Sequence, residues 1–124
     1  VAAEDCNIMF LNGKKLLNTC DNGCEFHHTL IRNLLGIVAQ NNMYLNQKIK
    51  YTSRKTTREK LMAYLTDQAK MKGSNDFTIP FNRQELADYL GVERSAMSAE
   101  LGKLTKLGIL QTQRSHFTLL KPLD

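Results

Sequence analysis

The chain has 124 residues, of which 42% are hydrophobic, enough to bury one modest core. It contains no apolar run of about 18 residues and no signal-peptide pattern at its start, which argues against a membrane protein and favours a cytoplasmic one. The net charge of +5 is uneven, since residues 1–47 hold three basic and four acidic residues while residues 48–124 hold fourteen and eight. Because the chain begins at Val1, we expect a fragment of a longer protein.

The first residues carry strand, turn and helix signals in succession. Residues 6–11 are predicted to form a strand, Asn12-Gly13 a turn and residues 14–17 a short helix. Soft ligands then occur at spacings that could converge on a metal ion: Cys20, Cys24 and His27. Cysteines in a cytoplasmic chain are more often free thiols, and this spacing matches no standard zinc or iron–sulfur pattern, so we expect no metal.

Residues 26–51 are predicted to form one long helix. Its seam alternates at spacings of four and three, the pattern of a coiled coil, through Ile31, Leu35, Val38, Asn42, Leu45 and Ile49. An amphipathic helix packed within a monomer is the alternative, because only about three heptads are present. We expect a homodimer, since the apolar stripe is too broad for a small chain to cover and Asn42 interrupts it as residues that set register do.

A second helix is predicted after a break at residues 52–55. Thr56 and Glu59 form the pattern of a capping box, and the helix is expected to pack through Leu61, Met62, Leu65 and Ala69. The break is interpreted as a hinge, where the state of a ligand could change the orientation of the C-terminal part of the chain. A cluster of basic residues lies around this break. We interpret it as a solvated helix face and not as a set of phosphate contacts; its members are Lys48, Lys50, Arg54, Lys55, Arg58 and Lys60.

Residues 82–107 have the pattern of two short helices separated by Gly91. Asn82 followed by Glu85 predicts a helix start at about Arg83, and Gly91 can take the left-handed conformation that ends this helix. Ala87 is small enough for the two helices to cross closely. The apolar residues expected to face the core are Leu86, Leu90, Val92, Met97, Leu101 and Leu104.

The outer face of the second helix is short, polar and basic, for which an ordinary helical hairpin gives no reason. It carries Glu93, Arg94, Ser95, Ser98, Ala99 and Gly102. In a helix-turn-helix, the second helix enters the major groove and its first turns touch base edges. Arg94 can bond guanine O6 and N7 with two parallel hydrogen bonds, and Ser95 and Ser98 can bond either base type. These three residues are the predicted base readers.

Short strand-like segments flank the two helices. Residues 108–113 and 117–120 are joined by Arg114-Ser115-His116, and a hairpin after the recognition helix is a wing. Residues 77–81 form a third such piece, which Pro80 confines to an edge or an end. The predicted fold is therefore mainly α with a small β part, a long helix followed by a winged helix-turn-helix. We expect Arg114 and His116 in the wing to contact phosphate.

Residues 58–60, 77–92 and 94–98 together resemble the DNA-binding domain of the Crp/Fnr (catabolite activator and fumarate-nitrate regulator) transcription factors. The match is dense there and weaker before about residue 25. The resemblance implies that Arg83 and Gln84 contact phosphate and that Arg94, Ser95 and Ser98 face bases. One position departs from the family pattern, because Ala99 stands where members commonly carry an arginine. We therefore expect fewer direct base contacts or an altered target sequence.

The resemblance also implies a domain organisation. Residues 1–25 would be the C-terminal remnant of an effector-binding β-roll, residues 26–53 the dimerisation helix and hinge, and residues 54–124 the winged helix-turn-helix. Most of the β-roll is missing from the sequence, so no cofactor is expected in this chain and the effector is unknown. The implied partners are double-stranded DNA, a second copy of the chain and RNA polymerase.

The sequence as a whole predicts a DNA-binding transcription regulator that acts as a homodimer on an inverted-repeat site. An enzyme is not expected, since no Ser/His/Asp set, paired-carboxylate motif, phosphate loop or HExxH motif is present. The alternative is a winged-helix protein-interaction module without specific DNA binding. That alternative would show no salt-sensitive binding to duplex DNA and would tolerate Arg94→Ala.

Overall fold

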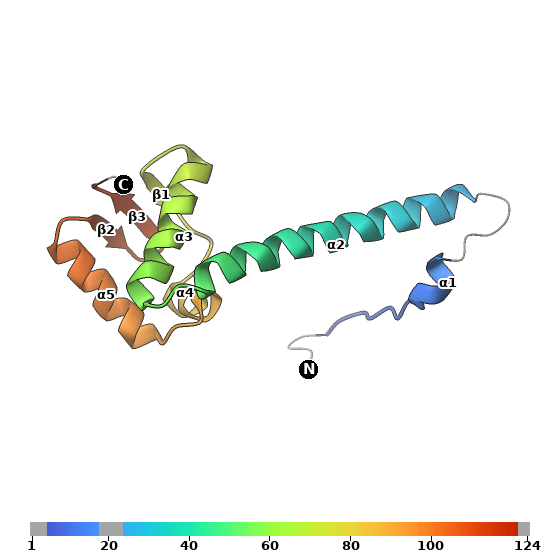
Figure 1. Cartoon of the computed structure of the whole chain (residues 1–124), viewed down its shortest axis with the longest axis horizontal. Coiled ribbons are helices and arrows are strands. Elements are labelled where there is room, and N and C mark those ends of the chain that lie inside the picture. Colours follow the sequence, from blue (N-terminus) through green and yellow to red (C-terminus); the bar gives the residue numbers. More distant parts are fainter. Residues whose placement is uncertain (1–4, 18–23, 122–124) are drawn as a thin grey trace. The chain divides into compact units, whose positions relative to one another are not determined.

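A computed structural model describes residues 5–17 and 24–121 (Figure 1). The chain divides into two compact units, residues 1–43 and 44–124, of which the second is the larger. The helices are α1 (Gly13–Leu17), α2 (Glu25–Thr52), α3 (Thr57–Lys72), α4 (Arg83–Leu90) and α5 (Arg94–Lys106). The strands are β1 (Asp76–Thr78), β2 (Leu110–Gln113) and β3 (His116–Leu119). Within the described ranges, no helix is both long and apolar enough to cross a membrane.

The segment before α1 is irregular, and the strand predicted at residues 6–11 was wrong. A strand needs a neighbour that satisfies its backbone N–H and C=O groups, and no described strand pairs with this segment. Its apolar side chains are accordingly exposed, with Phe10 92% accessible. The short helix after it is confirmed as α1, whose start is stabilised because the Asn12 side chain accepts hydrogen bonds from the backbone N–H groups of Lys14 and Lys15.

Helix α2 confirms the prediction of one long helix over residues 26–51. Four of its six predicted seam residues are exposed apolar side chains. Their exposed fractions are 64% for Leu35, 62% for Val38, 55% for Leu45 and 61% for Ile49. Ile31 is partly buried. The helix is therefore present as predicted, and its apolar stripe is open along the described residues.

The last turns of α2 belong to the second unit and pack into its core through an aromatic cluster. This cluster joins α2, α3, the loop before α4, and α4, and it consists of Tyr44, Tyr51, Tyr64, Phe81 and Tyr89. Tyr51 is 2% exposed, and its ring meets that of Tyr64 edge to face at 5.5 Å between centroids. Its hydroxyl donates to Asp67 Oδ2 at 3.0 Å, and Lys50 pairs with the same carboxylate.

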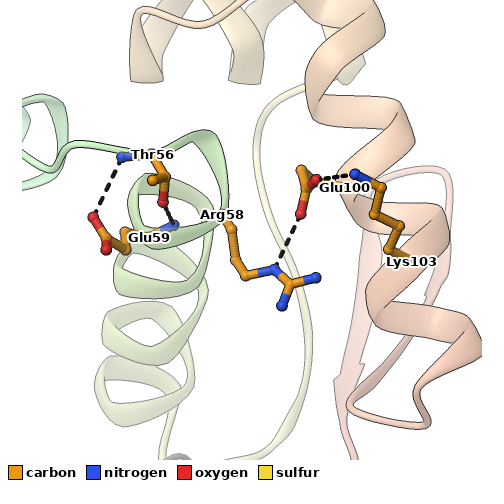
Figure 2. A network of polar contacts seen from close by, with 5 residues as sticks. All are labelled: Thr56, Arg58, Glu59, Glu100 and Lys103. Carbon is orange, nitrogen blue, oxygen red and sulfur yellow. Dashed lines mark hydrogen bonds and ion pairs between the residues drawn. The ribbon is translucent and has the colours of Figure 1, made fainter.

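Both predicted capping boxes are present. The Thr56 hydroxyl accepts from the Glu59 N–H at 3.1 Å, while the Glu59 carboxylate accepts from the Thr56 N–H (Figure 2). At α4 the corresponding pair is Asn82 and Glu85, and α4 ends at Gly91 with φ 61° in the left-handed region. The chain therefore starts α3 and α4 where the sequence predicted.

The core of the second unit lies between α3, α4, α5 and the sheet. The predicted apolar faces are confirmed: Val92 is partly buried, and the buried set contains Leu61, Met62, Leu65, Ala69, Leu86, Leu90, Met97, Leu101 and Leu104. Ala87 is fully buried. A larger side chain there would separate α4 from its neighbours, so this alanine fixes how closely the helices approach.

The three strands form one antiparallel sheet in the order β1-β3-β2. Strand β2 starts at Leu110, not at residue 108, because the N–H groups of Gly108 and Ile109 bond the last carbonyls of α5. Strand β1 ends at Thr78 instead of Phe81. The Ile79 N–H still donates to the Ser115 carbonyl at 3.0 Å, but Pro80 has no N–H to extend the ladder. β1 lies at an edge, as Pro80 required.

The buried tyrosines predict how stability depends on alkaline pH. Burial raises the pKa of Tyr64 to about 12, from an ordinary value of 10.0. The unfolded chain therefore loses this proton first, and stability should be complete below about pH 10 and fall between about pH 10 and pH 12. In melts followed by circular dichroism, Tyr64→Phe should show a shallower decline than the wild type. An unchanged slope for Tyr64→Phe would contradict the prediction.

Candidate nucleic-acid interface

Helix α5 has a core face and an open face. Met97, Leu101 and Leu104 are buried, whereas Arg94, Ser95, Ser98, Ala99 and Gly102 are exposed. The helix is capped by Glu93, whose carboxylate accepts from the Ala96 N–H at 2.9 Å. The hydrophobic contacts thus fix the helix on the domain while its first turns present only polar or small side chains.

The three predicted base readers differ in their surroundings. The Arg94 and Ser98 side chains form no hydrogen bond or ion pair with a described residue. The Ser95 hydroxyl, in contrast, donates to the Glu93 carboxylate. This bond and the helix N–H groups stabilise the ionised carboxylate, so the pKa of Glu93 is lowered. Ser95 can act on a base as an acceptor in this geometry, and as a donor only after it leaves Glu93.

A shallow recess of about 390 Å³ brings together residues from three elements. The start of α4, the start of α5 and the tip of the β2–β3 hairpin line it through Asn82, Arg83, Gln84, Arg94, Arg114 and Ser115. Three of these are arginines, and no acidic side chain lines the recess. Four of the predicted DNA-contacting residues therefore meet at one place, although they lie up to 31 positions apart in the sequence.

Arg83 is held between α4 and the wing. Its Nη2 donates to Thr112 Oγ1 at 2.6 Å, and its Cζ lies 5.0 Å from the centroid of the Phe117 ring. Partial burial lowers the pKa of Arg83, and its Nη1 is buried without a hydrogen-bond partner. A buried donor without an acceptor is costly. Arg83 therefore fixes the wing against α4, at the cost of one unsatisfied buried donor.

The remaining phosphate candidates are placed unequally. Gln84 is exposed and donates from Nε2 to Asp88 Oδ1 at 2.9 Å, one turn along α4. Arg114 is exposed at the tip of the wing. His116 lies across the sheet, where Nδ1 meets Thr78 Oγ1 at 3.0 Å and Nε2 meets Asp76 Oδ1 at 2.6 Å. Both nitrogens of His116 are thus engaged, and the residue does not line the recess.

Much of the basic cluster around residues 48–60 makes internal contacts, which the sequence did not reveal. Lys50 pairs with Asp67, and the Lys60 Nζ donates to the Gly91 carbonyl at 3.4 Å. Arg58 Nε donates to Glu100 Oε2 at 3.1 Å, which links α3 to α5 (Figure 2). These residues hold helices together, so the solvated-face interpretation is incomplete.

The structure describes two of the three candidate metal ligands, Cys24 and His27. Cys20 lies outside the described ranges, while Cys6 and Cys24 are exposed free thiols. Within the described part of the chain, no group of three potential ligand residues converges.

The arrangement of α4, the Gly91 turn, α5 and the β2–β3 hairpin defines a winged helix-turn-helix domain. The chain matches the Crp-like helix-turn-helix domain over residues 59–123, and it belongs to that family. The resemblance noted in the sequence is therefore confirmed. The family consists of DNA-binding transcription regulators and not of enzymes.

Two solved structures are similar to part of the chain. A protein from Eubacterium rectale assigned to the Crp/Fnr family of transcriptional regulators has a TM-score of 0.49 at 17% identity, covering 79% of this chain and 43% of that one. The reduced, Fe(II) CO-sensing protein from R. rubrum has a TM-score of 0.39 at 18% identity, covering 78% and 47%. The chain thus spans less than half of either protein. No curated protein matched the chain.

Substitutions of Arg114 at the tip of the wing should affect folding stability and DNA binding differently. Arg114 has φ 54° and is the one described residue other than glycine in the left-handed region. Arg114→Gly should therefore raise the free energy of unfolding by about 1 kcal/mol relative to Arg114→Ala, measured by urea denaturation. Both variants lack the guanidinium, so both should bind duplex DNA equally and more weakly than the wild type. Equal stability of the two variants would contradict the strain at Arg114.

Proposed function

We propose that this chain is the dimerising and DNA-reading part of a transcription regulator that recognises an inverted repeat. The observation that carries the proposal is the recess where Arg83, Arg94 and Arg114 converge beside the open face of α5 without an acidic neighbour. Such a concentration of guanidinium groups suits the negative charge of a DNA backbone. The hydrophobic core face of α5 keeps this surface in place.

In this proposal α5 enters the major groove. Arg94 reads guanine through two hydrogen bonds, and Ser98 bonds a base edge. Ser95 accepts a hydrogen bond from a base while its own hydroxyl donates to Glu93. Arg83, Gln84 and Arg114 contact phosphate on the flank of the recess that they line. His116 could join them only by leaving Asp76, so we rank it last among the phosphate contacts.

The proposed dimer uses the seam of α2. Leu35, Val38, Leu45 and Ile49 expose apolar surface along one helical stripe, at the a and d spacing of a two-stranded coiled coil. Pairing two copies would remove this surface from water. A two-fold pair would also present two recognition helices, which is why the target should be an inverted repeat.

A winged-helix module for protein assembly is the second candidate. Its supporting observation is the amount of cationic charge already used in internal contacts by Lys50, Arg58 and Lys60. The arginines of the recess make the first candidate stronger, because an assembly surface gives no reason to gather three of them. Duplex binding that is insensitive to salt or absent would favour the assembly module.

Binding of DNA should separate base reading from phosphate contact. A cognate duplex is first selected from a random pool with the wild-type chain, and we expect half-sites roughly 34 Å apart. Arg94→Ala should then cost about 1–3 kcal/mol on the cognate duplex and little on a scrambled one. Lys72→Ala is the matched control, because it removes an exposed charge at the far end of α3. Equal losses on both duplexes would refute base reading by Arg94.

The oligomeric state should depend on the seam. Leu35→Glu places a charge on the exposed apolar stripe, so sedimentation at micromolar concentration should shift from twice the chain mass of 14.1 kDa to one chain mass. Gln40→Glu, at an exposed position of α2 between the seam residues Val38 and Asn42, is the control and should stay dimeric. A monomeric wild type would remove the dimer from the proposal.

A further inference from the structure

Helix α5 borders a second hollow, on the side of the helix opposite to Arg94 and the arginine recess. A groove of about 480 Å³ runs between the first turn of α3 and α5. From α5 it is lined by Ala96, Ala99, Glu100 and Lys103, which recur at the spacing of one helical stripe. On the helical wheel this stripe adjoins Ser95, so its charge lies beside the surface proposed to read bases.

The charge in this groove is controlled by a three-residue network (Figure 2). Glu100 presents its two carboxylate oxygens to two cations, with Arg58 Nε 3.1 Å from Oε2 and Lys103 Nζ 2.6 Å from Oε1. Its side chain is 19% exposed, whereas those of Arg58 and Lys103 are more open at 45% and 62%. The carboxylate is therefore enclosed by its partners.

Glu100 keeps its negative charge at neutral pH. The hydrogen bond from Lys103, followed by that from Arg58, lowers the pKa of this carboxylate. A carboxylate next to a DNA-facing helix repels phosphate unless it is neutralised. Of its two partners, Lys103 belongs to the same helix and moves with it. Arg58 comes from α3, where the Thr56–Glu59 capping box fixes the first turn.

We infer that Arg58 is a positioning residue for DNA recognition, which acts by holding and neutralising Glu100 on the flank of α5. The inference rests on the proposed function, since it concerns how α5 approaches DNA. The groove has a net charge of +1 from Arg58, Lys103 and Glu100, and removing Arg58 takes it to zero and leaves the carboxylate held by Lys103 alone. Arg58 then differs from Arg83 and Arg114, because its effect depends on another protein residue.

The test is a double-mutant cycle on duplex binding with Arg58→Ala, Glu100→Gln and the double variant. Arg58→Ala should weaken binding to cognate and scrambled duplexes about fivefold at low salt, because it removes one unit charge and also leaves the Glu100 carboxylate less tightly held. Glu100→Gln should strengthen binding about twofold to fivefold, because it removes the repelling charge. The double variant should bind within about twofold of Glu100→Gln, since it loses only the charge of Arg58 and has no carboxylate to release.

Other roles for Arg58 give different patterns. A direct phosphate contact by Arg58, or an effect of its charge alone, would leave the double variant about fivefold weaker than Glu100→Gln, and this result would overturn the inference. A merely structural ion pair would make Glu100→Gln weaken binding and lower the melting temperature as Arg58→Ala does, which would also overturn it. Glu100→Gln keeps Arg58, so weaker binding by this variant would overturn the inference even where Arg58→Ala does not fold.

A failure of the proposed function has its own signature. If the wild-type chain binds no duplex at any salt concentration, the DNA-reading proposal falls and this inference falls with it. If the wild type binds but the double variant stays weak, only the role assigned to Arg58 is lost. Arg58→Lys keeps the positive charge and should bind within about twofold of the wild type, which distinguishes loss of charge from damage to the α3 terminus.

Discussion

The second unit depends on the turn at Gly91. At φ 61° this residue ends α4, its N–H bonds the carbonyls of Ala87 and Asp88, and the Val92 N–H bonds the carbonyl of Ala87 at 3.0 Å. A side chain at Gly91 would be strained in this conformation. A further element meets the turn, since Lys60 of α3 bonds the Gly91 carbonyl. The turn that leads into α5 is thus held by contacts from both α3 and α4.

The basic charge of the chain is divided between structure and surface. Lys50, Arg58, Lys60 and Arg83 each contact an internal partner. The guanidinium of Arg94 makes no such contact with a described residue, and Arg114 is exposed at the wing tip. A net charge of +5 therefore overstates the charge available to a ligand, and the local arrangement of arginines is the more informative property.

Local signals predicted the elements well. Thr56, Asn82 and Gly91 act within a few residues along the chain, so their caps and turn could be inferred from spacing alone. The strand at residues 6–11 failed because a strand depends on a partner that the segment itself does not specify. The contacts that complete the site join residues far apart in sequence, since Arg58 and Glu100 are 42 positions apart. Such a pair has no periodicity or motif that a single sequence reveals, and the aromatic cluster escaped prediction for the same reason.

The aromatic cluster also changes what the predicted hinge can do. The break between α2 and α3 is present, but Tyr51 and Lys50 cross it to Asp67, and the Tyr51 ring is buried against Tyr64. Rotation about the break would expose these rings and separate the Lys50–Asp67 pair. Leu45 and Ile49, which carry part of the proposed dimer seam, lie in the same unit as α5, the proposed recognition helix. Pairing at these residues would therefore orient α5 through packed side chains and not through a free linker. Any reorientation of α5 relative to α2 must first disrupt the aromatic cluster.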